Sequence, residues 1–175
     1  MITVTLGTNP FPFSRAIAWL QELLEKGVII ESVFIQHGTS DVSTLISHPL
    51  VSAAPFVKVD HLMNMIDQST LVISHAGQGT TRSLMERQSP FVLLPRLARY
   101  GEHVDNHQLR FAQALAPKGI VHCLSVVQLE AVILDPPLHE QQPLFDGPRL
   151  ADHLLSRYPS KHSESVQSVY EQPRS

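Results

Sequence analysis

Small and polar residues separate two apolar runs in the segment LVISHAGQGTTRSLMERQSPFVLLP (71–95). Gly77 and Gly79 leave room for a ligand to approach the backbone, and the residues after them suit the start of a helix. The first N–H groups of a helix lack intrahelical partners and, with the positive end of the helix dipole, attract phosphate. His75 follows the first run and can add a donor. The pattern predicts a diphosphate site at His75, Gly77, Gly79 and Thr80, with Thr80 or Thr81 as the helix cap.

A second loop of this kind, LGTNP (6–10), follows the apolar run ITVTL and precedes a helical pattern. A turn between a strand and a helix is the usual place for backbone contact with phosphate. Gly7 and Thr8 are therefore candidates for the same diphosphate. Two plainer interpretations stay open: Gly7 only permits a tight turn, and His75 is satisfied by a backbone carbonyl.

Three other motifs with similar residues do not fit the spacing. A dinucleotide fingerprint needs glycine at position 82, which is Arg82, and a P-loop needs a Gly-Lys-Ser/Thr triplet that the chain lacks. A hydrolase elbow around Ser74 needs glycine at position 72, which is Val72. The sequence therefore argues against NAD binding, nucleoside triphosphate hydrolysis and serine catalysis.

The loop after FVLLP, RLARYGEHVDNHQ, is dense in polar side chains. His103 and His107 are four residues apart, so on a helix they share a face, and Glu102 or Asp105 could complete a metal site. The order is not H-E-x-x-H, and no third ligand is evident, which disfavours a catalytic metal. The other interpretation is that Gln108 and the residues just before it bind hydroxyl groups of a neutral ligand, because an amide both donates and accepts.

Strand and helix patterns alternate along the chain. The predicted strands are 2–6, 32–36, 56–59, 71–74, 91–95 and 120–124, and the predicted helices are 14–26, 62–68, the one opened by the glycine loop, 104–115 and 126–134. This alternation predicts an α/β fold with one parallel sheet. Ligands bind at the carboxyl ends of such strands, so the loops after 2–6, 56–59, 71–74 and 91–95 should face one another.

Length and composition favour one domain. The 175 residues are 43% hydrophobic and 17% charged, enough for one core, which we place at residues 1–135. We expect a linker and a short helix at 136–158 and a disordered tail at 159–175. The formal net charge of −3, without a Lys/Arg run, argues against nucleic acid as a partner.

The single cysteine and the amino terminus indicate the compartment. Cys123 has no partner for an intrachain disulfide, which fits a reducing cytoplasm, and we interpret it as a buried small hydrophobe. The terminus MITVTLG has the pattern of a strand and not of a signal peptide. No apolar run approaches the roughly 20 residues that span a bilayer. We expect a soluble, cytoplasmic protein.

The motifs HAGQGT, SPFVLLPR and YGEHVDNHQ together resemble the C-terminal domain of glycosyltransferase family 28, the nucleotide-sugar-binding half of GT-B enzymes. The resemblance covers about residues 3–134. It is strongest to single-domain members of the PssE type from bacterial exopolysaccharide synthesis. It extends to the soluble subunit of the two-component enzyme that adds the second N-acetylglucosamine to dolichol-linked sugars. It implies a Rossmann-like domain with a UDP-sugar as substrate and neither cofactor nor metal.

The family's binding residues carry over to matching positions of this chain. In the family, a histidine and a loop of glycine, serine or threonine hold the donor diphosphate, which implies this role for His75, Gly77, Gly79 and Thr80. A glutamine after the next strand contacts the donor sugar, which implies that role for Gln108.

Recognition of the nucleoside follows the family less closely. Uracil usually lies against backbone just before the helix that precedes the glycine loop, here near Val59. Many relatives carry a glutamate six residues after the first loop glycine to hold the ribose, whereas that position is Ser83 here and Glu86 lies one turn further on. The PssE-type branch resembles this chain in having serine there, so Ser83 is our candidate near the ribose.

The resemblance implies a split enzyme, because a GT-B transferase uses two such domains and this sequence has residues for one. This chain would bind the donor and stabilise the departing diphosphate, without a metal, while a membrane-associated partner supplies the general base and a lipid-linked acceptor. We expect hexosyl transfer in polysaccharide synthesis only with that partner, which recruits the chain to the inner face of the membrane; a homo-oligomer is also compatible. Two alternatives stay open: a regulatory or scaffolding subunit, which Ser83 favours, and the less favoured His-ligated metal enzyme.

Overall fold

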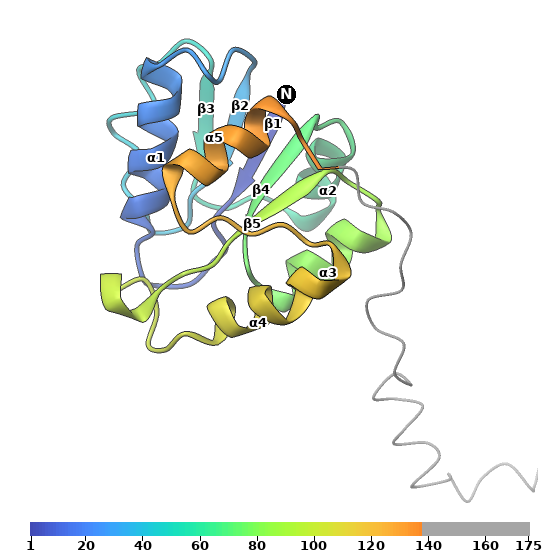
Figure 1. Cartoon of the computed structure of the whole chain (residues 1–175). Coiled ribbons are helices and arrows are strands. Elements are labelled where there is room, and N and C mark those ends of the chain that lie inside the picture. The colour runs from blue at the N-terminus through green and yellow to red at the C-terminus, as the bar shows by residue number, and fades with distance from the viewer. Residues whose placement is uncertain (138–175) are drawn as a thin grey trace, which may run out of the picture. The chain divides into compact units, whose positions relative to one another are not determined.

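Five parallel strands form one sheet in the order β3-β2-β1-β4-β5 (Figure 1). The structure, a computed structural model, describes residues 1–137. The strands are β1 Ile2–Thr5, β2 Val33–Gln36, β3 Val51–Ala54, β4 Leu71–His75 and β5 Phe91–Leu94. The predicted parallel α/β architecture is confirmed. The predicted linker (136–158), except for its first two residues, and the predicted tail (159–175) lie outside the described residues.

Helices cover both faces of the sheet and connect all neighbouring strands in the chain except β2 and β3. They are α1 Ser14–Glu25, α2 Val59–Asp67, α3 Gln78–Glu86, α4 His107–Leu115 and α5 Val126–Leu134, with short 3-10 turns η1 Ala98–Tyr100 and η2 Ala116–Lys118. Figure 1 shows α1 and α5 on one face of the sheet and α2 and α3 on the other. The sheet is therefore covered from both sides, as continuous apolar strands require.

The core on the α1 and α5 face is built from alternate strand residues. Val4 and Ile73, on neighbouring strands, belong to one buried cluster with Leu20 of α1 and Leu129 of α5. Each of these side chains is fully buried, and burying an aliphatic side chain of this size contributes about 2 kcal/mol. This packing fixes the strand ends from which the loops of the site extend.

The order of the strands reverses between β1 and β4. From β1 the chain builds the sheet in one direction through β2 and β3, and β4 then pairs with the other side of β1, with Thr5 opposite Ser74. Because all strands are parallel, the loops after β1 and β4 leave the same edge of the sheet side by side. Such a switch point is where open α/β sheets bind their ligands.

Two predicted strands are wrong. The run FVKV (56–59) is not a strand: β3 is formed by the preceding residues VSAA, and Val59 already begins α2. IVHCL (120–124) contributes only one bridge, between His122 and Leu93. The helix predicted from 104 begins at His107. β3 lies at the edge of the sheet and is only partly buried, so its small residues lack the apolar pattern of a central strand.

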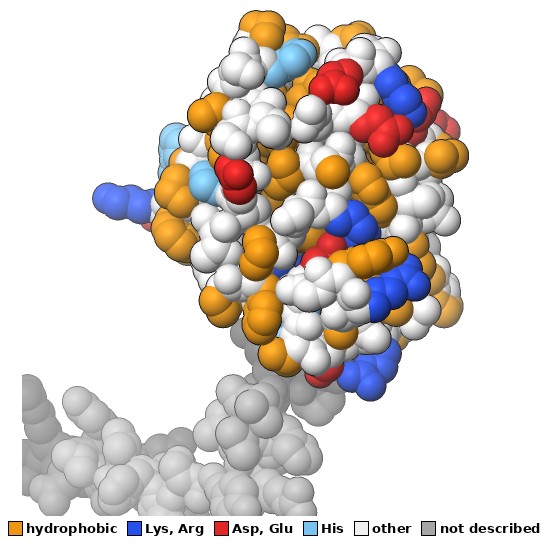
Figure 2. Space-filling view, turned by 90° about the vertical axis from the view of Figure 1, so that its left-hand side faces the viewer, with side chains coloured by type: hydrophobic (Ala, Val, Ile, Leu, Met, Phe, Trp, Pro, Cys, Tyr) orange, Lys and Arg blue, Asp and Glu red, His pale blue; other side chains and the backbone are white. Residues whose placement is uncertain are grey.

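Figure 2 shows the side of the molecule on which α1 lies. Acidic and basic side chains are interspersed there, without a block of one sign. That distribution agrees with the lack of a nucleic-acid footprint in the sequence. Among residues 1–137, no helix has both the length and the apolar content needed to cross a membrane.

Candidate functional site

The imidazole of His75 lies against two glycines from different loops. A Cβ atom placed on Gly7 would lie 2.7 Å from His75 Nε2, and one placed on Gly77 would lie 2.4 Å from the same atom. Gly7 also has a φ of +77°, which side chains disfavour. The two loops that sequence analysis assigned to one diphosphate therefore meet at the switch point, with the His75 ring touching both.

The other ring nitrogen of His75 faces the backbone. Nδ1 lies 3.2 Å from the carbonyl oxygen of Thr5, and because a carbonyl only accepts, Nδ1 must carry the proton. Burial lowers the pKa of His75 from 6.5 to about 4, against the opposing effect of this hydrogen bond and with a further lowering by the nearby positive charge of Arg96. The ring is therefore neutral at pH 7, and Nε2 holds a lone pair. Only the protonated ring can donate to a phosphate, a condition that the sequence did not reveal.

The helix after the glycine loop begins earlier than predicted. Gly77 is the N-cap residue of α3, without a side-chain cap, so the expectation that Thr80 or Thr81 caps this helix is wrong. The first intrahelical bond runs from the N–H of Thr81 to the carbonyl of Gly77 (2.9 Å), which leaves the N–H groups of Gln78, Gly79 and Thr80 ahead of it. Apart from its chain neighbours and the backbone of its own helix, no atom of residues 1–137 lies within 4 Å of a Cβ placed on Gly79. The first turn of α3 is thus accessible at Gly79.

Gln108 and Ser83 make hydrogen bonds within the protein. Gln108 is 4% exposed, and its Oε1 accepts the backbone N–H of Arg96 at 3.1 Å. The Ser83 hydroxyl donates to the Gly79 carbonyl at 3.3 Å, whereas Glu86 pairs with Arg82 at the surface. Gln108 is therefore turned into the protein, and Ser83 lies one turn along α3 from the accessible glycine.

Thr8 and Val59 lie at the surface. Thr8 follows Gly7 and keeps an exposed side chain at the edge where the strands end. Val59 is 70% exposed and is the first residue of α2, so the backbone just before this helix is 56–58. The expectation that uracil lies against the backbone near Val59 stays a prediction.

A buried arginine that sequence analysis missed joins the loops of the site. Arg96 is 1% exposed, and its guanidinium donates to three carbonyl oxygens: Leu6 (2.8 Å), Phe11 (2.7 Å) and Glu102 (3.1 Å). The first two belong to the loop after β1 and the third to the loop after β5. The Arg96 guanidinium also lies 4.7 Å from the ring centre of Phe13. Arg96 therefore holds the loop that carries Gly7 and places a buried positive charge behind it. An arginine directly after a continuous apolar run was the signal for it.

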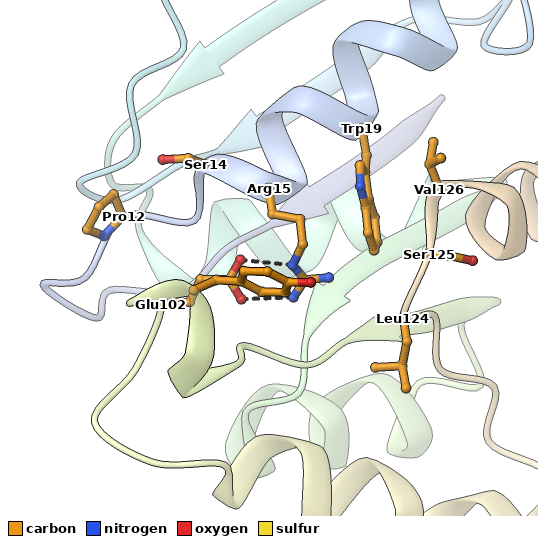
Figure 3. Close-up of a pocket in the computed structure, with 9 residues that line it drawn as sticks. Pro12, Ser14, Arg15, Trp19, Glu102, Leu124, Ser125 and Val126 are labelled. Atoms are coloured by element: carbon orange, nitrogen blue, oxygen red, sulfur yellow. Dashed lines mark hydrogen bonds and ion pairs between the residues drawn. The ribbon is translucent and has the colours of Figure 1, made fainter.

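A buried ion pair lies beside a pocket of about 540 Å³ (Figure 3). Arg15 of α1 donates through Nε and Nη2 to the carboxylate of Glu102, at 2.9 and 2.8 Å, and its guanidinium lies 4.6 Å from the ring centre of Trp19. Glu102 is 2% exposed and also accepts the N–H of Leu97. The pocket is lined by the start of α1, Tyr100, Glu102 and residues 124–126, and none of the predicted diphosphate residues lines it.

The histidines of the polar loop come together, although not as predicted. His103 precedes α4 and His107 begins it, so a turn and not a shared helix face brings them to Asp105. Glu102, the alternative ligand, is committed to Arg15 and does not belong to this cluster. Cys123 is fully buried, as predicted, and burial raises the pKa of its thiol to about 12.

The chain matches one protein family over most of its length. Residues 1–149 match the family described as glycosyltransferase family 28 C-terminal domain. No curated protein matches the chain.

Solved structures share the fold at low sequence identity. The glycosyltransferase SnogD from Streptomyces nogalater superposes with a TM-score of 0.52 at 20% identity, over 77% of this chain and 34% of its own. MurG from Acinetobacter baumannii gives 0.54 at 20% identity, over 75% of this chain and 39% of its own. The solution structure of ALG13 gives 0.53 at 20% identity, over 81% of this chain and 90% of its own.

The chain thus spans little more than a third of the first two enzymes and nearly all of the ALG13 structure. Three observations agree on the same kind of domain: the reversal of strand order at β1 and β4, the glycine loops on either side of His75, and the family match. The chain belongs to the glycosyltransferase family 28 C-terminal domains and has the Rossmann-like fold of the nucleotide-sugar-binding half of a GT-B glycosyltransferase.

Proposed function

We propose that this chain is the UDP-sugar-binding subunit of a split GT-B glycosyltransferase that transfers a hexosyl residue to a lipid-linked acceptor. The observation that carries the proposal is the contact of the His75 ring with both Gly7 and Gly77, beside the accessible first turn of α3. A diphosphate lying over Gly77 to Thr80 would reach the N–H groups of that turn and His75 Nε2 together. The absence of side chains at Gly7 and Gly77 makes room for the imidazole, and the open space at Gly79 leaves the backbone of this turn available to an anion.

In this proposal the protein assists the departure of the diphosphate. Negative charge grows on that group as the bond to the sugar breaks, and preorganised donors stabilise it. The donors are the N–H groups at the start of α3, the Thr80 hydroxyl and the protonated ring of His75, which its bond to Thr5 holds in orientation. The bound anion raises the pKa of His75, so donor binding takes up a proton. The Arg96 charge adds a favourable field, and no metal is needed.

The acceptor and the general base belong, in this proposal, to a membrane-associated partner that recruits the chain to the cytoplasmic face of the membrane. The extent of the likeness to the ALG13 structure, 90% of whose length is covered, supports a subunit of one domain. The family membership supports a transferase. Transfer should therefore be weak with this chain alone and appear on mixing with the partner, whereas full transfer by the purified chain would contradict the split.

A thermal shift with UDP tests donor binding directly. A ligand that binds only the folded state at 100 times its Kd adds about 2.7 kcal/mol of stability, so the melting temperature must rise. His75→Ala removes a donor to a charged group, worth roughly 1.5 to 3 kcal/mol, and should weaken UDP binding by about 10- to 150-fold. His48→Ala is the matched control, because His48 lies just before β3, at the opposite edge of the sheet.

Calorimetry in two buffers of different ionisation enthalpy then tests the proton uptake. The observed binding enthalpy should depend on the buffer for the wild type and much less for His75→Ala. No thermal shift with UDP in the wild type would reject donor binding and favour a regulatory or scaffolding subunit.

A further inference from the structure

His103, Asp105 and His107 form a cluster of metal-ligating side chains in the connection between β5 and α4. Each offers one ligand atom, and these three atoms lie within 4.8 Å of one another. Nδ1 of His107 lies 2.6 Å from Asp105 Oδ1, and Nδ1 of His103 lies 3.6 Å from the same oxygen. The two rings stand edge to face, with centres 4.4 Å apart. Both histidines thus direct the same ring nitrogen toward one carboxylate.

The nitrogen of His103 at this position makes no hydrogen bond within residues 1–137. His103 is 14% exposed, its Nδ1 is shielded from water, and no hydrogen-bond partner for it occurs among the described residues. Most buried polar atoms are satisfied, and leaving one without a partner destabilises the folded state. A neutral imidazole carries an electron pair on the ring nitrogen that holds no proton. A cation between the three side chains would use that pair.

The backbone around the cluster is already fixed. Asp105 Oδ1 accepts the N–H of His107 at 2.9 Å, which ties the carboxylate to the start of α4. Asn106 Oδ1 accepts the N–H of Ala98 at 2.9 Å, which ties the same turn to η1. The His103 ring lies 6.0 Å, centre to centre, from that of Phe11. The three ligand atoms therefore approach one another in a turn that other contacts hold in place, as a binding site requires.

We propose that His103, Asp105 and His107 bind a divalent transition-metal ion of the Zn²⁺ type. Two imidazoles and one carboxylate suit Zn²⁺, Co²⁺ or Ni²⁺, whereas Mg²⁺ and Ca²⁺ favour sites built from oxygen. Three protein ligands leave a fourth position of a tetrahedral ion for water. The bonds from such an ion to its ligands are about 2.0 to 2.2 Å long. Two ligand atoms on one ion are then separated by nearly the distance already found between His103 Nδ1 and Asp105 Oδ1.

Binding changes the protonation of one ring and little else. The N–H at Nδ1 of His107 donates to Asp105, so this proton must move to Nε2 when Nδ1 takes the ion. Arg110 Nη2 lies 3.7 Å from Asp105 Oδ2, but the Arg110 side chain is 71% exposed and can turn away. The bound ion would hold in place the turn that immediately precedes Gln108 and the rest of α4. This role is structural, separate from departure of the diphosphate, and does not depend on the proposed function.

Cobalt titration of the full chain, expressed without a histidine tag, tests the site. Co²⁺ in a site with few ligands absorbs visible light, and we expect one such ion per chain, displaced by Zn²⁺ but not by Mg²⁺. His103→Ala should weaken Co²⁺ binding by at least about tenfold, since loss of an outer partner alone costs that much. Asp105→Asn keeps an oxygen for the His107 N–H and should also weaken binding, whereas His48→Ala, outside the cluster, should not.

Two results would overturn the proposal: no visible absorption at any Co²⁺ concentration at which the protein stays soluble, or equal absorption in the wild type and in His103→Ala. The thermal shift with UDP, measured on the same samples, separates this outcome from the proposed function. If the chain binds UDP but not Co²⁺, the metal site alone is refuted. If it binds Co²⁺ but not UDP, donor binding alone is refuted.

Discussion

Gly79 is the position at which binding and stability can be made to change in opposite directions. It is the second residue of α3 and is exposed, and in the described part of the chain only its own helix backbone and chain neighbours approach the place that a Cβ would take. In a helix the bond from Cα to Cβ tilts toward the amino end. A methyl group on Gly79 would therefore point to the side where the proposed diphosphate lies. Gly79→Ala tests whether an anion approaches that backbone.

The expected effect on stability is small and favourable. Alanine in place of glycine inside a helix gains roughly 0.5 to 1 kcal/mol, and less is gained in the first turn, so we expect about 0.5 kcal/mol. For a chain of 175 residues this raises the melting temperature by about 1 to 2 °C. The empty space around the position means that no packing cost opposes this gain.

The expected effect on UDP binding is large and unfavourable. A phosphate oxygen must lie about 2.7 to 3.2 Å from an N–H to accept from it, and the methyl group prevents that approach. Loss of one hydrogen bond to a charged group costs roughly 1.5 to 3 kcal/mol, or about 10- to 150-fold in Kd. Calorimetry with UDP, inorganic pyrophosphate and uridine should show this loss for the first two ligands and not for the third.

Gly77→Ala provides the matched comparison. Its φ of −82° suits alanine, but the new Cβ would lie 2.4 Å from His75 Nε2 and force the ring aside, so both stability and UDP affinity should fall. If Gly79→Ala gains stability and its Kd for UDP stays within about twofold of the wild type, the diphosphate does not lie on this turn, and the assignment of Gly79 and Thr80 is refuted.

Three further predictions concern buried groups. The pKa of His75 is about 4 in the folded protein and 6.5 unfolded, so below pH 6.5 only the unfolded chain takes the proton; this site should therefore cost about 2 kcal/mol of stability at pH 5 and about 3 kcal/mol near pH 4. His75→Asn keeps a donor for Thr5 and should lose less stability between pH 7 and pH 5 in urea titrations than the wild type does; equal losses would contradict the buried neutral ring. Arg96→Met leaves three carbonyls without their donor and should cost about 3 kcal/mol or more in urea unfolding, whereas a loss below about 1 kcal/mol would mean that water replaces the guanidinium. Cys123, with its pKa near 12, is about one part in ten thousand thiolate at pH 8 and should react with a disulfide reagent only after guanidinium unfolds the chain; rapid labelling of the folded protein would refute its burial.

The sequence predicted the elements whose patterns come from burial on both faces. LVIS and FVLLP are continuous apolar runs and form neighbouring strands, β4 and β5. VSAA was missed as a strand because an edge strand needs few apolar residues, whereas FVKV has strand-forming residues that α2 overrides from Val59 onward. Local propensity is a weak guide where tertiary packing does not reinforce it.

The sequence located the loops of the candidate site but not the protonation of its histidine. The hydrogen bond from His75 Nδ1–H to the Thr5 carbonyl depends on the register of β1 against β4, which places Thr5 opposite Ser74. Arg96 escaped notice because its one local signal, the position directly after a continuous apolar run, does not distinguish an arginine that turns inward from one that faces water. His103 and His107 were recognised by their spacing, although the turn at Asp105 and not a helix face unites them.

The stacking of Trp19 on Arg15 provides the protein with its own optical reporter. Trp19 is the only tryptophan of the chain, and Arg15 ties it to Glu102 in the connection that leads to α4. Any rearrangement of that connection changes the charge next to the indole and with it the colour and intensity of the emitted light. Movement of this part of the molecule when a ligand is added can therefore be followed in real time without attaching a dye.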